Sequence, residues 1–199
     1  MADKMPAKKQ EKQDWKKTVV LYMHDILMML VTMMVVFLLV FRVIVVSGSS
    51  MYNTLIDGDY LLLVSNLFYQ KQEYGDVIVV SKESFDNGIP IIKRVIATEG
   101  QTVDIDFEQG IVYVDGVALE EDYTYTPTNI SEGMDFPLTV EPDCVFAMGD
   151  NRNGSLDSRC PEIGQIDRRE ILGKALFLFF PATDRGQTGP DFTRIGAIR

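Results

Sequence analysis

The hydrophobic pattern of this chain changes character near residue 46. From Ile26 to Val46, the only charged residue in twenty-one positions is Arg42. A helix of that length is about 30 Å long, which matches the hydrocarbon core of a bilayer. The pattern predicts a transmembrane anchor over residues 18–46, with Arg42 close enough to its end for the side chain to reach the interface.

Beyond the anchor, apolar residues fall in short runs that are typical of β-strands and are bounded by turn-forming residues. The runs are 60–65, 76–81, 91–98, 144–148 and 175–180. Residues 102–119 alternate around two Gly-containing turns, which indicates a hairpin or meander, and residues 167–174 could add one helical turn. The predicted fold class is mainly β: a single N-terminal transmembrane helix, then an antiparallel all-β domain over 47–199 with a hairpin and loop insertion at about 104–142.

The flanking charges indicate an orientation for the anchor. Residues 1–17 hold six lysines and three acidic residues, and an excess of lysine marks the cytoplasmic end of a membrane helix. Residues 1–17 are therefore expected to be a cytoplasmic tail, and residues 47–199 are expected outside. His24 would lie at the inner edge of the span.

The outer part of the chain is acidic. Residues 51–199 carry twelve Lys and Arg against twenty-five Asp and Glu, a net charge of −13. Such a surface repels nucleic acid, so nucleic acid is not an expected partner.

The small residues Ser47, Gly48 and Ser49 suggest an alternative, in which the apolar segment is a cleaved export signal. A removable signal has a shorter apolar core of roughly 7–15 residues and usually an alanine at the cut. The segment here is longer and no alanine follows it, so the sequence favours a retained anchor.

Two cysteines, Cys144 and Cys160, lie in the predicted outer domain. A disulfide is chemically permitted outside the cell, but the sequence does not establish that the geometry suits one, so both states stay open. The spacing fits no metal-ligand pattern, and His24 is the only histidine. Neither a metal nor a cofactor is expected.

Three serines crowd the exit of the apolar segment, in "SGSSM" at residues 47–51. A nucleophilic serine needs a group that takes its proton. His24, on the opposite side of the predicted anchor, cannot serve, which excludes a Ser-His-Asp triad. A lysine can act as the base if burial or nearby positive charge keeps its amine neutral.

Lys93 is the lysine that best meets this condition. It lies in "PIIKRVIA", where alternation along a strand places it on a face with Ile91 and Val95. Arg94 shares the other face, which is also apolar. Lys71, Lys82 and Lys174 are the remaining outer lysines, and the first two lie among polar residues in expected turns.

These residues resemble the bacterial type I signal peptidases, which are membrane-anchored Ser-Lys proteases. Four blocks carry the resemblance in the family's order: "SGSSMYNTL" (47–55), "YGDVIVV" (74–80), "IIKRVIATEGQTV" (91–103) and "MGDNRNGSLDSR" (148–159). The resemblance covers essentially the whole chain. It implies Ser50 as the nucleophile and Lys93 as the general base.

The resemblance also implies roles for the neighbouring residues. Ser155 would hydrogen-bond the Lys93 amine, while Asp157 and Arg159 would form a supporting ion pair. Further support would come from Arg94, and from Asp150 as part of the same scaffold as the ion pair. Met51 would contribute to an apolar face toward the substrate or the membrane.

The chain departs from the family at two positions near the nucleophile. Asn53 stands where the family usually has a proline, which would stiffen the turn. Gly48 stands where some members have a serine that helps to stabilise the oxyanion. That hydroxyl is absent here, so the resemblance leaves the Ser50 backbone N–H as the main expected donor.

The function that the resemblance implies is the removal of signal peptides from exported preproteins by a monomeric enzyme in the plasma membrane. The expected partners are preprotein signal peptides and the lipid bilayer. Two alternatives stay open. A soluble, DNA-linked Ser-Lys autoprotease is disfavoured by the anchor and the acidity. A membrane-tethered β-domain that binds exported peptides without cutting them would be expected to lack Ser50 or Lys93.

Overall fold

The chain begins with one long helix. The structure, a computed structural model, describes residues 7–184 and 186–198, and helix α1 (Ala7–Val40) is the α-helix of that part. Its segment Trp15–Val40 (26 residues) contains an 18-residue window with a mean hydropathy of 2.3 and is long and apolar enough to cross a membrane. Of the predicted basic tail, residues 1–6 lie outside the described residues and the rest belong to α1.

The helix ends earlier than the predicted anchor. α1 stops at Val40, and Phe41–Val45 form strand β1, which pairs antiparallel with Tyr60–Val64. The prediction of an anchor that reaches residue 46 was therefore wrong at this end, and Arg42 lies in a strand opposite Leu63. The β-branched run after Phe41 suits a strand, and its pairing partner is distant in sequence.

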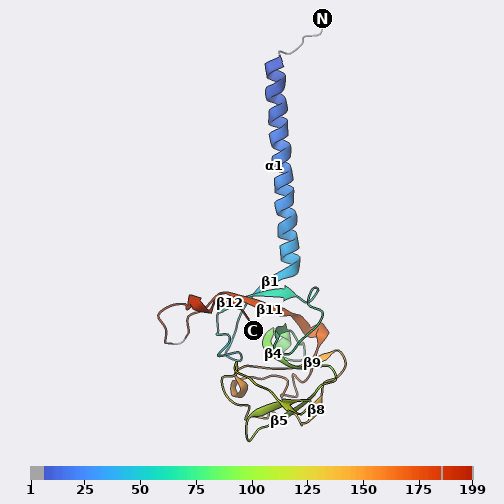
Figure 1. The fold of residues 1–199 in the computed structure, drawn as a ribbon, viewed down its shortest axis with the longest axis vertical. Coiled ribbons are helices and arrows are strands. Elements are labelled where there is room, and N and C mark those ends of the chain that lie inside the picture. Colours follow the sequence, from blue (N-terminus) through green and yellow to red (C-terminus); the bar gives the residue numbers. More distant parts are fainter. Residues whose placement is uncertain (1–6, 185, 199) are drawn as a thin grey trace. The chain divides into compact units, whose positions relative to one another are not determined.

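Residues 41–199 form a second compact unit, which consists mostly of antiparallel strands (Figure 1). In the described residues, the larger sheet has the order β1-β2-β11-β3-β4-β9-β10, with β12 paired to β11. Beyond β1, its strands are β2 (Tyr60–Ser65), β3 (Val77–Val80), β4 (Ile91–Thr98), β9 (Cys144–Met148), β10 (Ile166–Asp167), β11 (Ile171–Phe180) and β12 (Gly196–Ala197).

A smaller sheet comes from the predicted insertion. Its order is β7-β6-β5-β8, with β5 (Thr102–Asp106), β6 (Ile111–Val114), β7 (Val117–Ala118) and β8 (Leu138–Thr139). The β5–β6 hairpin is the alternating segment of the sequence, so the expected hairpin is confirmed. The described chain also has four short 3₁₀ helices: η1 (Asp86–Gly88), η2 (Arg152–Gly154), η3 (Arg168–Glu170) and η4 (Phe192–Arg194).

The core explains why these strands form. One apolar cluster joins the two sheets, because Ile96 of β4 and Phe146 of β9 pack with Val103 and Val112 of the small sheet. A second cluster, including Leu61 and Val79, lies within the larger sheet. The expected strands appear within a residue or so of their predicted bounds, except β11. The expected helical turn within 167–174 is the shorter 3₁₀ helix η3, which ends at Glu170. β11 therefore starts at Ile171, four residues before the predicted strand.

Candidate active site

The proposed nucleophile lies on a turn between β1 and β2. This turn is closed by Tyr52 N–H donating to the Ser49 carbonyl at 3.0 Å and by Leu55 N–H donating to the Met51 carbonyl at 2.8 Å. The Asn151 backbone N–H donates to the Ser50 carbonyl at 3.0 Å. The nucleophile turn is thereby tied to the segment after β9, which carries the "GDNR" residues of the last block.

The backbone conformation at Asn53 explains why this position does not hold a proline. Its φ is +93°, a conformation that proline, with φ fixed near −65°, cannot adopt. Asparagine tolerates this region better than most residues. The turn therefore takes a path that requires a residue other than proline at this position.

Met51 does not have the location that was expected. Its side chain is 1% exposed and belongs to the core cluster with Leu55 and Leu61. The expectation that Met51 faces the substrate or the membrane was wrong. The turn directs this side chain inward while Ser50 stays partly accessible.

Lys93 meets Ser50 directly. The Lys93 Nζ donates to the Ser50 Oγ at 3.0 Å, and the lysine is 2% exposed in the middle of β4. Burial lowers the pKa of Lys93 from 10.5 to about 8, although the negative charges of Asp157 and Glu132 act in the opposite direction. A neutral amine beside a serine hydroxyl is therefore accessible near neutral pH.

The other lysines considered from the sequence have different partners. Lys71 is exposed and pairs with Glu73, while Lys82 donates to the Ile163 carbonyl at 2.6 Å. Lys174 pairs with the carboxylate of Asp76. In the residues that the structure describes, none of these three amines makes a hydrogen bond to Ser50.

Ser155 does not make the predicted bond. Its side chain is buried at 4% exposed, and in the part of the chain that the structure describes its hydroxyl donates to the Leu156 carbonyl at 3.5 Å. A hydrogen bond to the Lys93 amine is absent there, so that expectation was wrong for this structure. Ser155 still lies at the site, since a Cβ added to Gly149 would be 2.5 Å from both the Ser155 Cβ and the Ser50 carbonyl oxygen.

Asp157 and Arg159 form the ion pair that the resemblance implied. The Arg159 Nε and Nη2 each donate to an Asp157 carboxylate oxygen at 2.9 Å, and both residues are fully buried. Asp157 also accepts the Gly149 N–H at 2.9 Å. Two parallel bonds between planar groups fix this pair firmly. It interacts electrostatically with Lys93.

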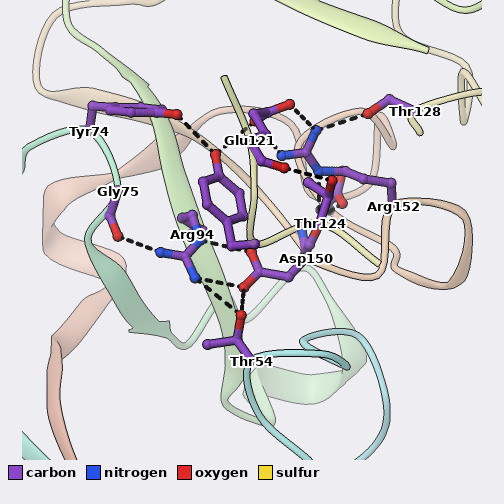
Figure 2. A network of polar contacts seen from close by, with 12 residues as sticks. Thr54, Tyr74, Gly75, Arg94, Glu121, Thr124, Thr128, Asp150 and Arg152 are labelled. Carbon is purple, nitrogen blue, oxygen red and sulfur yellow. Dashed lines mark hydrogen bonds and ion pairs between the residues drawn. The ribbon is translucent and has the colours of Figure 1, made fainter. Parts of the chain in front are cut away.

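Asp150 belongs to a different pair. It binds Arg94 through Nε at 2.8 Å and Nη2 at 2.7 Å, while Thr54 donates to the same carboxylate at 2.5 Å. The expectation that Asp150 shares the scaffold of Asp157 and Arg159 is thus corrected. The Arg94–Asp150 pair joins β4 and the end of β9 to the nucleophile turn (Figure 2).

Tyr123 lies between two buried arginines and was missed by sequence reasoning. Its ring centre is 4.0 Å from the Arg94 guanidinium carbon and 5.9 Å from that of Arg152. Its hydroxyl donates to Glu121 at 2.7 Å and contacts the Tyr74 hydroxyl at 3.1 Å. Glu121 in turn binds Arg152 (Figure 2). The loop after β7, which has no hydrophobic period, is ordered by these polar contacts.

A backbone donor is available for an oxyanion. Within residues 7–184 and 186–198, no hydrogen bond uses the Ser50 N–H. At Gly48, φ is +88° and a Cβ would meet no atom within 4 Å. A side chain there would be strained by the backbone rather than blocked by neighbours.

The turn borders an open cavity of about 410 Å³. The lining residues come from the turn, the loop after β7, the segment after β9 and the chain after β11: Ser49, Tyr52, Ile56, Asp57, Tyr125, Asn151, Thr183 and Asp184. The described residues hold no group of three His, Cys, Asp or Glu that could bind a metal. Cys144 and Cys160 are both free thiols.

A serine hydroxyl held against a buried amine is an arrangement suited to Ser-Lys hydrolysis. A family model described as signal peptidase, peptidase S26, matches residues 18–180. The chain therefore belongs to this family and is a serine peptidase.

Two sequence relatives agree with this assignment. A probable signal peptidase I-1 from Synechocystis sp. is 42% identical over 161 residues, covering 76% of this chain and 77% of that protein. Signal peptidase I from Bacillus amyloliquefaciens is 33% identical over 156 residues, covering 74% and 78%. A solved signal peptidase I from Enterococcus faecalis is 30% identical with a TM-score of 0.43, covering 53% of this chain and 97% of that one.

Proposed function

We propose that this chain removes signal peptides from exported preproteins, with Ser50 as the nucleophile and Lys93 as the general base. The observation that carries the proposal is the 3.0 Å hydrogen bond from the buried Lys93 amine to the Ser50 hydroxyl. Burying a lysine amine is costly, and a buried titratable group with a shifted pKa beside a serine hydroxyl is a candidate for a functional role.

The chemistry follows from this contact. The neutral Lys93 amine takes the Ser50 proton as Oγ bonds to the carbonyl carbon of the scissile peptide. The ammonium then gives that proton to the leaving nitrogen, and an acyl-enzyme forms. Lys93 next takes a proton from water, the hydroxide attacks the ester, and Ser50 Oγ leaves with the proton from Lys93. The Ser50 N–H is the expected donor to the oxyanion.

The substrate would bind as an extended strand. β1 is an outer strand of the larger sheet in the described residues, and its chain runs directly into the nucleophile turn. An extended peptide beside this edge would pair with main-chain groups of β1. Its scissile bond would then lie near Ser50, and small side chains would be favoured before the cut.

We also propose a single-pass plasma-membrane location for a monomer, with the N-terminus in the cytoplasm and residues 41–199 outside. The lysines of residues 1–17 support this orientation. The outer unit carries an exposed aromatic patch, defined as Tyr60, Phe179, Phe180 and Phe192. Tyr60 and Phe180 rings lie 5.8 Å apart, and such a patch is suited to a lipid surface.

The test uses the full chain in detergent with a preprotein that carries an Ala-x-Ala site. Cleavage is followed for the parent, Ser50→Ala and Lys93→Met, with Ser47→Ala as the control. Ser47 is exposed and lies outside the cavity. Loss of cleavage in the first two variants, with parent-like cleavage in the control, supports the proposal. A parent that binds the preprotein without cutting it would instead indicate a tethered binding domain.

A further inference from the structure

Glu132 lies in the loop between β7 and β8, close to the site but outside the family's motif blocks. Its φ is +55°, which is uncommon for a residue with a side chain. The loop is fixed on Arg159, whose carbonyl accepts the Met134 N–H at 3.0 Å and whose Nη1 donates to the Ile130 carbonyl at 2.8 Å. Glu132 is therefore held in place by contacts two residues before it and two residues after it in the chain.

The Glu132 carboxylate is directed into the protein. Its side chain is 9% exposed, and one oxygen lies 3.4 Å from the Arg159 Nη2. The other oxygen accepts the Asp157 N–H at 3.4 Å. Arg159 already makes two 2.9 Å bonds to Asp157. Two carboxylates thus share one guanidinium, and the second has longer and weaker contacts.

With Asp157 and Glu132 both ionised, the charges in this buried group balance only when Lys93, which interacts electrostatically with its other members, is protonated. Lys93 and Arg159 then carry two positive charges, and Asp157 and Glu132 carry two negative ones. Arg94 and Asp150 form a separate neutral pair. A neutral Lys93 leaves one excess negative charge where every side chain is nearly inaccessible. Burial makes such an excess costly.

We infer that Glu132 is a positioning residue that controls the charge of Lys93. Ionised Glu132 holds the proton on the amine, and protonated Glu132 lets the amine become the neutral base. The inference rests on Lys93 being the base of the proposed reaction. It makes the β7–β8 loop part of the proton chemistry as well as of the fold.

The titration behaviour of the surrounding groups agrees with this geometry. The groups that act on Lys93 are Asp157, Glu132, Arg159 and Asp150. Burial and the adjacent Asp157 raise the pKa of Glu132 from 4.5 to about 7, while Arg159 and Lys93 act against the rise. Lys93 and Glu132 therefore titrate in neighbouring pH ranges, so that the protonation of one depends on that of the other.

The first experiment measures kcat/KM against pH for the full chain in detergent, as parent and as Glu132→Gln. The neutral amide imitates a protonated Glu132 permanently. Without the negative charge, the pKa of Lys93 falls, so the acid limb should move about one pH unit lower. At a fixed pH on that limb, the variant should cleave up to about tenfold faster.

The control is Asp135→Asn, which removes an exposed negative charge three residues away in the same loop. Its acid limb should coincide with that of the parent. If Glu132→Gln lowers activity at every pH without moving the midpoint, Glu132 only supports the fold and the inference is overturned. An unchanged profile overturns it equally.

A second readout does not depend on activity. The Glu132 carboxyl carbon is followed by NMR in ¹³C-Glu-labelled protein and assigned by its absence in Glu132→Gln. It should titrate near pH 7, and at higher pH in Lys93→Met, because coupling between two sites is reciprocal. Coupling without loss of cleavage in Ser50→Ala would refute the proposed function alone. Loss of cleavage without coupling would refute this inference alone.

Discussion

At the residue scale, the proposed role of the buried Lys93 as the base predicts the pH range of activity. The amine is a base only when neutral, and burial lowers its pKa from 10.5 to about 8. We therefore expect kcat/KM to rise with pH and to reach half its plateau near pH 8. Initial rates on a peptide substrate between pH 6 and 10 measure this directly. A rate that is flat from pH 7 to 9 would exclude Lys93 as the base.

Gly149 keeps two parts of the site in contact. A Cβ at this position would overlap the Ser155 hydroxyl and lie 2.5 Å from the Ser50 carbonyl oxygen. Gly149→Ala should push the nucleophile turn away from Lys93. We expect at least a tenfold loss of kcat/KM and a free energy of unfolding lower by about 1–3 kcal/mol.

The matched control is Gly189→Ala. A Cβ there would meet no atom within 4 Å, and Gly189 has no strained φ. Both variants are compared by cleavage rate and by urea denaturation. Parent-like cleavage in Gly149→Ala would mean that the turn yields to the added methyl group without moving Ser50.

At this scale the sequence predicted the Ser50–Lys93 pair but not the side-chain directions around it. Strand alternation indicated that Lys93 is buried, and it is 2% exposed. The turn after β1 has no such period, so the inward direction of Met51 could not be read. The direction of the Ser155 hydroxyl depends on contacts between distant segments, which no local pattern encodes.

At the element scale, Tyr123 fixes the loop after β7 against β4 and η2. Tyr123→Ala removes the ring beside Arg94 and Arg152, and we expect the free energy of unfolding to fall by about 2–4 kcal/mol. Tyr123→Phe keeps the ring and loses only the hydroxyl contacts, so its loss should be about 1 kcal/mol. Urea denaturation of both variants measures the difference. Equal losses would show that the hydroxyl, and not the stack, holds the loop.

The strands were predictable where the loop was not. Runs of β-branched and apolar residues gave β2, β3, β4 and β9 nearly to the residue. The segment 120–137 has few apolar residues and no period, so its order could not be predicted. It is fixed instead by hydrogen bonds to Arg152 and Arg159, whose burial was itself not apparent from their polar surroundings in the sequence.

At the scale of the whole molecule, the boundary between helix and β-domain lies at Val40. Hydropathy alone placed it six residues later, because β1 is as apolar as the end of α1. We expect a chain that starts at Phe41 to fold and to cleave a soluble peptide at a rate within about threefold of the parent, since the second unit contains Ser50, Lys93 and their partners. Circular dichroism and peptide cleavage check both points. Loss of structure in this variant would make α1 part of the folding unit.

The aromatic patch is expected to contact lipid, because such a surface is seldom left exposed without a partner. In the chain that starts at Phe41, Phe180→Ser with Phe192→Ser should weaken binding to zwitterionic lipid vesicles at least about tenfold, since both rings are roughly half exposed and free to enter the interface. Vesicle sedimentation measures the binding, and peptide cleavage checks that the site is intact. The control is Val117→Ser, because Val117 is an exposed apolar residue on the small sheet. This variant should bind the vesicles as the unmodified chain does. Equal binding by all three chains would mean that α1 alone accounts for membrane attachment.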